Sequence, residues 1–145
     1  RPTVYLALKN TIGTVVEFGC GFGSSPLIRQ YCNEHGREFI SLETDPIWAA
    51  KFEGTRVIDN FANYVNDDIG LLFIDGKPGE ERKDRLQQFA PLAKVLIAHD
   101  TQQSADYCYG MSEILSKFKY RLDFKPPGFP ETTAVSNYVN ITDWI

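Results

Sequence analysis

The sequence has few cysteines and no long apolar run. Its three cysteines, at positions 20, 32 and 108, form no CxxC pair and no metal-ligand spacing, so we expect neither a disulfide framework nor a zinc site. A sparse, odd number of cysteines suits a reducing compartment, and we expect a cytoplasmic protein. No stretch approaches the about 20 apolar residues of a membrane span. No signal peptide is visible either.

Positive charge is not in excess. The chain has 15 Lys and Arg against 19 Asp and Glu, a formal charge of −4 and a pI near 5.1. Scattered charges of this balance favour no basic stripe, and we therefore expect no nucleic-acid partner and no membrane partner. The 43% hydrophobic and 23% charged fractions exclude disorder and a coiled coil. The 145 residues predict one domain, residues 1–145. Because the sequence starts at Arg1, we expect a minimal or truncated form.

Short apolar runs alternate with stretches of helical spacing. The predicted strands are residues 14–18, 38–42, 56–58, 70–74, 94–98, 120–125 and 132–141, and the predicted helices are residues 25–36, 45–51, 80–93 and 102–118. This alternation predicts an α/β, doubly wound, Rossmann-like fold, with a mostly parallel sheet, helices on both faces and an antiparallel C-terminal strand. In such sheets ligands bind beyond the carboxyl ends of the strands.

A glycine-rich loop follows the first predicted strand. Gly19, Gly21 and Gly23 allow a tight turn and a close backbone approach to a ligand, and the next helix offers free N–H groups. The dinucleotide pattern is GxGxxG, but here the third glycine comes one residue early and Ser24 stands where that pattern has glycine. Glu43 follows the second predicted strand, 20 residues after Gly23, where a carboxylate can bind a ribose diol.

Five segments together resemble the motifs of the class I S-adenosylmethionine-dependent methyltransferases. They are residues 14–25, 39–48, 55–61, 70–76 and 94–101. The marks are Glu17 two residues before the glycines, the GxGxG loop, the acidic end of strand two, and aspartates after strands three and four. The resemblance implies S-adenosylmethionine as cofactor. It implies cofactor contacts by Glu17, Gly19, Cys20, Gly21, Gly23, Ser24, Glu43, Asp59 and Asn60. From the residues alone, Asp59-Asn60 is equally a turn, and Glu17 a plain strand-end carboxylate.

Ionisable residues follow the fourth and fifth predicted strands. Asp75 follows the central strand and His99-Asp100 the next, so we expect these three side chains to converge on an acceptor as catalytic groups. This arrangement is similar to that of metal-dependent O-methyltransferases, which implies Mg²⁺ bound by Asp75 and Asp100. His99 departs from that pattern, because an acidic residue is expected there. Lys77 and Arg82 are candidates to meet an acidic acceptor, although most of their charged run favours a solvated helix face.

The predicted acceptor is a hydroxyl on a small molecule. Residues 42–48 and the His-Asp pair resemble the plant glucuronoxylan O-methyltransferases, which implies a carbohydrate acceptor. Residues 126–130 are either a rim over the acceptor or a rigid connector. Two alternatives to a methyltransferase stay open: a nicotinamide-dependent oxidoreductase, which the glycine spacing disfavours, and a non-catalytic nucleoside-binding module. Since few residues precede the first strand, we expect a homo-oligomer or a partner subunit to complete the acceptor site.

Overall fold

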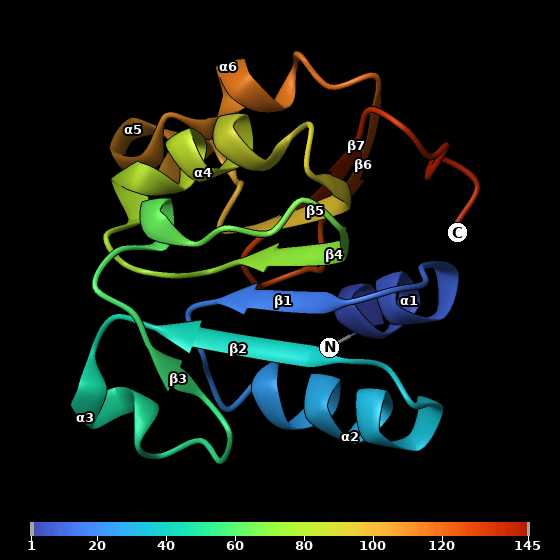
Figure 1. The fold of residues 1–145 in the computed structure, drawn as a ribbon. Helices are drawn as coiled ribbons and strands as arrows, with labels where there is room; N and C mark the ends of the chain where they lie inside the picture. Colours follow the sequence, from blue (N-terminus) through green and yellow to red (C-terminus); the bar gives the residue numbers. More distant parts are fainter. Residues whose placement is uncertain (1, 145) are drawn as a thin grey trace.

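A seven-stranded sheet runs through the computed structural model, which describes residues 2–144 (Figure 1). The strands are β1 (Val15–Phe18), β2 (Phe39–Glu43), β3 (Arg56–Val57), β4 (Ile69–Ile74), β5 (Ala93–His99), β6 (Tyr120–Phe124) and β7 (Thr132–Ser136). Their order in the sheet is β3-β2-β1-β4-β5-β7-β6. β1 to β5 are parallel, and β7 is antiparallel to both of its neighbours. The predicted doubly wound sheet with an antiparallel C-terminal strand is confirmed.

Helices cover both faces of the sheet. α1 (Pro2–Asn10) and α2 (Ser25–His35) pack on one face, and α4 (Arg82–Phe89) and α6 (Met111–Leu115) pack on the other. The remaining helical segments are α3 (Pro46–Ala49), α5 (Gln103–Tyr109) and the 3₁₀ turns η1 (Phe61–Asn63) and η2 (Gly79–Glu81). β4 is buried on both faces, and from Leu71 to Ile74 its side chains alternate between the two cores with the period of two that a strand imposes. Among residues 2–144, no helix is long and apolar enough to cross a membrane.

The local signals for the first two connecting helices act as their chemistry predicts. Pro26 stands in the first turn of α2, and Gly36 ends that helix in the left-handed conformation, with φ +64°. Asp45 caps α3, because its carboxylate accepts hydrogen bonds from the N–H groups of Ile47 and Trp48. Both helices therefore start directly behind the ends of β1 and β2, which brings the intervening loops to one edge of the sheet.

Several predicted bounds are wrong. Residues 2–10, which carried no prediction, form α1. The predicted helix over 102–118 is two helices, because Gly110 adopts φ +60° between them. The helix predicted over 45–51 is shorter in the structure, where it is α3. The helix predicted over 80–93 is also shorter, and it consists of η2 followed by α4. The predicted strand over 132–141 ends at Ser136. The hydroxyl of Ser136 accepts hydrogen bonds from the backbone N–H groups of Tyr138 and Val139, which turns the chain out of the strand.

Candidate functional site

The glycine loop leaves the carboxyl end of β1 and crosses directly over the end of β4. Gly19 has φ +88°, and a Cβ built there would lie 2.5 Å from the Cα of Gly76. Gly19 also donates its N–H to the carbonyl of Leu42, at 2.8 Å. In contrast, a Cβ on Gly21 would meet nothing within 4 Å. The first glycine is therefore needed for packing, and the second faces open space that a ligand can occupy.

Glu17 lies beneath this loop and holds it in place. Its side chain is fully buried in β1, and its carboxylate accepts hydrogen bonds from the hydroxyls of Ser24, Ser25 and Ser41 at 2.7–2.9 Å. Ser25 in turn accepts the N–H of Gly21, at 2.9 Å. Burial raises the pKa of Glu17 to about 7, although the three hydroxyls act in the opposite direction. The predicted cofactor residues Glu17 and Ser24 thus meet each other, and Ser24 makes no side-chain cap on α2.

Glu43 joins the loop to the end of β2. One carboxylate oxygen accepts the N–H of Cys20 at 3.1 Å, and the other accepts those of Thr44 and Asp45 at 3.0 and 3.3 Å. The predicted residues Cys20 and Glu43 are therefore in direct contact at the carboxyl edge of the sheet. Burial, and then the charge of Glu43, raise the pKa of the Cys20 thiol to about 12, so this cysteine is not a nucleophile.

Trp48 packs against the loop rather than offering an open face. Its indole N–H donates to the carbonyl of Cys20 at 2.8 Å. Its ring makes edge contacts with Phe22 and Phe52, with centroids 5.7 and 5.5 Å apart, and Lys51 lies over it. Trp48 therefore has a packing role, and its indole fixes the position of the loop from the side of α3.

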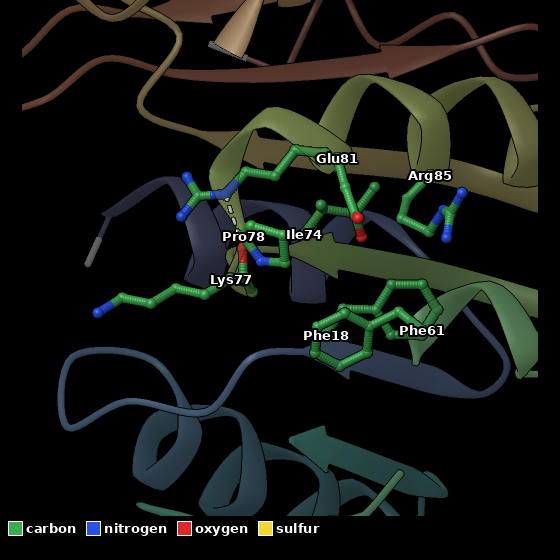
Figure 2. Close-up of a pocket in the computed structure, with 9 residues that line it drawn as sticks. Phe18, Phe61, Ile74, Lys77, Pro78, Glu81 and Arg85 are labelled. Atoms are coloured by element: carbon green, nitrogen blue, oxygen red, sulfur yellow. Dashed lines mark hydrogen bonds between the residues drawn. The ribbon is translucent and has the colours of Figure 1, made fainter. Parts of the chain in front are cut away.

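Asp59 and Asn60 follow β3 on the same edge. Asp59 is exposed, and Asn60 caps η1 by accepting the N–H of Ala62 at 2.9 Å, so the turn expected for this pair is present. Phe61 stacks on Phe18, with ring centroids 4.9 Å apart (Figure 2). It also fills the place that a Cβ on Gly76 would take. Consequently the space beside these rings is a cavity of about 10 Å³, the size of a single water molecule.

The three predicted acceptor-side residues converge. His99 Nδ1 lies 3.1 Å from a carboxylate oxygen of Asp100 and 3.5 Å from one of Asp75. Asp100 has φ +59°, the only positive value among the non-glycine residues of the described chain. This conformation is disfavoured for most side chains and tolerated by aspartate. It turns the Asp100 side chain back toward His99, and no side chain caps α5. An imidazole that lies beside two carboxylates at the carboxyl edge of a sheet is a candidate general base.

Arg82 completes the cluster. The prediction that its charged run forms a solvated helix face is wrong for this residue. It begins α4 with 6% of its surface exposed, so it is not on a solvated face. Its guanidinium lies 3.3 Å from a carboxylate oxygen of Asp75 and 3.0 Å from one of Asp100. Lys77, the other candidate, is exposed and points away from the cavity of Figure 2.

A divalent cation does not fit this cluster as it stands. Ligand atoms of Asp75, His99 and Asp100 lie within 4.8 Å of one another, which is compatible with a metal site. However, the guanidinium of Arg82 already contacts both carboxylates, so an added cation would meet a fixed positive charge. The prediction of Mg²⁺ held by Asp75 and Asp100 is not supported.

A cavity of about 390 Å³ opens beside His99. Its walls come from the start of α1, from the ends of β4 and β5, and from the segment before β7. The lining residues are Pro2, Thr3, Val4, Phe73, His99, Pro126, Phe129, Pro130 and Thr132. Residues 126–130 therefore form the wall of a pocket, which is the rim interpretation of this segment. The start of α1, for which the sequence carried no prediction, supplies the opposite wall.

Comparisons with known proteins place this architecture. No protein-family model and no curated protein sequence matches the chain. Three methyltransferase structures match its fold. The first is an S-adenosylhomocysteine-bound methyltransferase from Podospora anserina, with a TM-score of 0.62 and 14% identity over 92% of this chain and 75% of that one. The second is a protein from Streptococcus pneumoniae assigned as a tRNA methyltransferase, in complex with S-adenosylmethionine, with a TM-score of 0.60 and 11% identity over 99% of this chain and 76% of that one. The third is an rRNA methyltransferase from T. thermophilus in complex with S-adenosylmethionine and guanosine, with a TM-score of 0.57 and 15% identity over 97% of this chain and 40% of that one.

The chain has the class I methyltransferase fold. The superfamily resemblance carried by the five motifs is thereby confirmed at the level of the fold. Two of the matched structures are of enzymes named for tRNA and rRNA. The prediction that excluded a nucleic-acid partner is therefore wrong. A mildly acidic net charge does not exclude a nucleic-acid partner, because binding depends on the local charge of the binding surface rather than on the total charge.

Proposed function

We propose that the chain is an S-adenosylmethionine-dependent methyltransferase that methylates an acceptor hydroxyl. The observation that carries this proposal is the junction of the glycine loop with β2, where the carboxylate of Glu43 accepts the N–H of Cys20 at 3.1 Å. This junction places a carboxylate and a glycine turn open at Gly21 at the same edge of the sheet. A nucleoside with a ribose diol and an amino-acid tail needs both features.

Each predicted cofactor residue has a defined task in this proposal. Gly21 and Gly23 line the path of the methionine part, and Glu43 accepts hydrogen bonds from the ribose. Asp59 and Asn60 lie toward the adenine. Glu17 acts from below, because its serine contacts fix the N–H of Gly21 through Ser25. The cofactor itself supplies the reactive group, an electrophilic sulfonium methyl.

The acceptor occupies the 390 Å³ cavity, where His99 meets walls of proline and phenylalanine. In the transfer step, the acceptor oxygen forms a bond to the methyl carbon as the carbon–sulfur bond breaks. The sulfur keeps that electron pair, and the hydroxyl proton passes to His99. The carboxylate of Asp100 lies 3.1 Å from Nδ1, so it faces the proton-accepting imidazole. Apolar walls suit a ring-bearing acceptor, and both sugars and RNA nucleosides carry such hydroxyls.

Two glutamates at opposite ends of β2 give a matched test of the cofactor site. Glu43 ends the strand beside the glycine loop, whereas Glu38 precedes it at the opposite edge and is exposed. Calorimetric titration with S-adenosylhomocysteine should show binding to the wild type and to Glu38→Gln, and binding at least about tenfold weaker to Glu43→Gln. Equal binding by all three proteins would remove Glu43 from the site. Absence of binding to the wild type would contradict the proposal as a whole.

Transfer of a labelled methyl group to sugars and to RNA then tests the acceptor. A hydroxyl acceptor predicts a label that is stable as a methyl ether. A label found only on base nitrogen would overturn the hydroxyl assignment and keep the methyltransferase. One observation favours a second candidate, a nucleoside-binding module without turnover, because Arg82 neutralises both acceptor-side carboxylates. That candidate predicts cofactor binding and no transfer to any acceptor.

A further inference from the structure

Arg82 makes more contacts with the ends of β4 and β5 than an ordinary ion pair requires. Besides both carboxylates, its guanidinium donates to three carbonyl oxygens at the ends of these strands. Those carbonyls belong to Gly76 at 3.0 Å, His99 at 3.2 Å and Asp75 at 3.3 Å. The planar face lies over the ring of Tyr109, with the guanidinium carbon 5.1 Å from its centroid. A buried cation with this many partners is rigidly placed.

The positive charge of Arg82 lies where the surrounding side chains attract a cation. Two carboxylates and an imidazole that lie within 4.8 Å of one another repel any further negative charge and attract a cation. The guanidinium meets an oxygen of each carboxylate, at 3.3 and 3.0 Å. Its fork also binds the strand-end carbonyls, which a small spherical ion would bind with a different geometry.

We propose that Arg82 is the resident cation of the acceptor site, doing the work that a divalent metal would do among these carboxylates. It holds the carboxylates of Asp75 and Asp100 in place, and so it positions His99, which contacts both. Arg82 is a positioning residue in this account, since it acts through its carboxylate partners. The effect on methyl transfer rests on the proposed function, but the exclusion of a metal does not.

The start of α4 explains why this arginine stays in place. One turn after Arg82, Leu86 is fully buried in the core, and Phe89 follows it on the same face. The helix is therefore anchored on the sheet, and its first residue is held over the ends of β4 and β5. Because the two strands are adjacent and parallel, one side chain reaches both ends. A lysine could not replace this fork, because its single ammonium cannot meet five oxygen atoms in this arrangement.

The direct test is the binding of Mn²⁺, followed by the loss of the spectroscopic signal of the free ion. The wild type should bind no Mn²⁺ in the millimolar range. Arg82→Gln removes the charge and keeps an oxygen that can serve as a ligand, so this variant should bind Mn²⁺ with a dissociation constant at least tenfold below the highest Mn²⁺ concentration at which the wild type shows no binding. Arg82→Lys retains the charge and should not bind. Lys83→Gln removes one charge at the neighbouring position and should behave as the wild type.

Two further proteins make the result decisive. Arg82→Gln combined with Asp100→Asn should lose the gained Mn²⁺ binding, which places the ion at this cluster. If Arg82→Gln does not fold, the melting temperature of the wild type decides: a rise with Mn²⁺ that Asp100→Asn abolishes overturns the proposal, and no rise supports it. A folded Arg82→Gln protein that binds no Mn²⁺ also overturns it. Failure to find methyl transfer would defeat the proposed function and leave the Mn²⁺ result unaffected.

Discussion

Gly19 and Gly76 pack backbone against backbone, so that a Cβ on Gly19 would lie 2.5 Å from the Cα of Gly76. Gly76 has its own constraint, since a Cβ there would lie 2.2 Å from the ring of Phe61. The end of β1 is therefore locked to the end of β4 through two residues that must lack side chains. This contact fixes how the glycine loop sits relative to Asp75, the residue that follows β4.

Two alanine substitutions in the loop should separate folding from binding. Gly19→Ala adds a Cβ at φ +88° against backbone atoms, and we expect it to lower the free energy of unfolding by about 2–3 kcal/mol. Gly21→Ala adds a Cβ that meets nothing, so it should leave stability within about 0.5 kcal/mol and weaken the binding of S-adenosylhomocysteine. Urea unfolding and calorimetric titration measure the two effects. Equal loss of stability in both variants would contradict this division.

The burial of Glu17 predicts a specific dependence of stability on pH. Its pKa is about 7 in the folded protein against 4.5 as the ordinary value, so between these values the folded state keeps a proton that the unfolded state releases. The free energy of unfolding should therefore fall as the pH rises from 4.5 to 7, by about 3 kcal/mol for this group.

Glu17→Gln should remove that part of the pH dependence. Urea unfolding at pH 5, 6, 7 and 8 should give a wild-type curve that falls relative to the variant curve and runs parallel to it above pH 7. The exposed Glu38→Gln provides the control, and its curve should follow that of the wild type. A constant difference between the wild type and Glu17→Gln across this range would show that Glu17 is ionised in the fold.

Substitution of the acceptor-side histidine should affect turnover and leave the cofactor in place. His99→Gln removes the proposed base, and we expect kcat to fall by about 100-fold or more, the typical contribution of a general base. The affinity for S-adenosylhomocysteine should stay within about twofold. Asp100→Asn should also lower kcat, because the carboxylate that lies 3.1 Å from Nδ1 of His99 loses its charge. Unchanged turnover in both variants would remove the pair from catalysis.

A substitution in the wall of the cavity should test acceptor binding without changing the stability of the fold. Phe129 lines the cavity beside His99, yet 73% of its surface is exposed. Phe129→Ala should therefore change the free energy of unfolding by less than about 0.5 kcal/mol. Lost contact with the acceptor should raise KM for the acceptor and leave KM for S-adenosylmethionine unchanged. The substitution Tyr107→Ala, on the exposed face of α5, is the control and should change neither constant.

The central strands could be predicted because β1, β4 and β5 are short apolar runs that a polar residue or a glycine turn ends or follows. The signals at Pro26, Gly36 and Asp45 act through the local backbone, and the sequence alone is enough to interpret them. α1 was missed because its buried residues, Val4, Ala7 and Leu8, are few and pack only against a distant core. The break at Gly110 was also missed, since a glycine within a helical pattern is often tolerated.

Some features of the candidate site could be predicted from the sequence and others could not. The convergence of Asp75, His99 and Asp100 followed from the rule that parallel strands end at one edge. The role of Arg82 did not follow, because its sequence neighbours are charged and only the packing of α4 turns it inward. The cavity joins residues 2–4 to residues 126–132, a separation in sequence that no local pattern reveals.

Thermal unfolding with separate additions of S-adenosylhomocysteine, NAD and NADP tests the central claim most directly. A ligand at 100 times its dissociation constant stabilises the folded state by about 2.7 kcal/mol. For a domain of this size that corresponds to a rise in Tm of roughly 5–10 °C. The account predicts this rise with S-adenosylhomocysteine alone. A rise only with NAD or NADP would contradict it and identify a nicotinamide-binding protein, and no rise with any of the three would show that the edge of the sheet binds none of these cofactors.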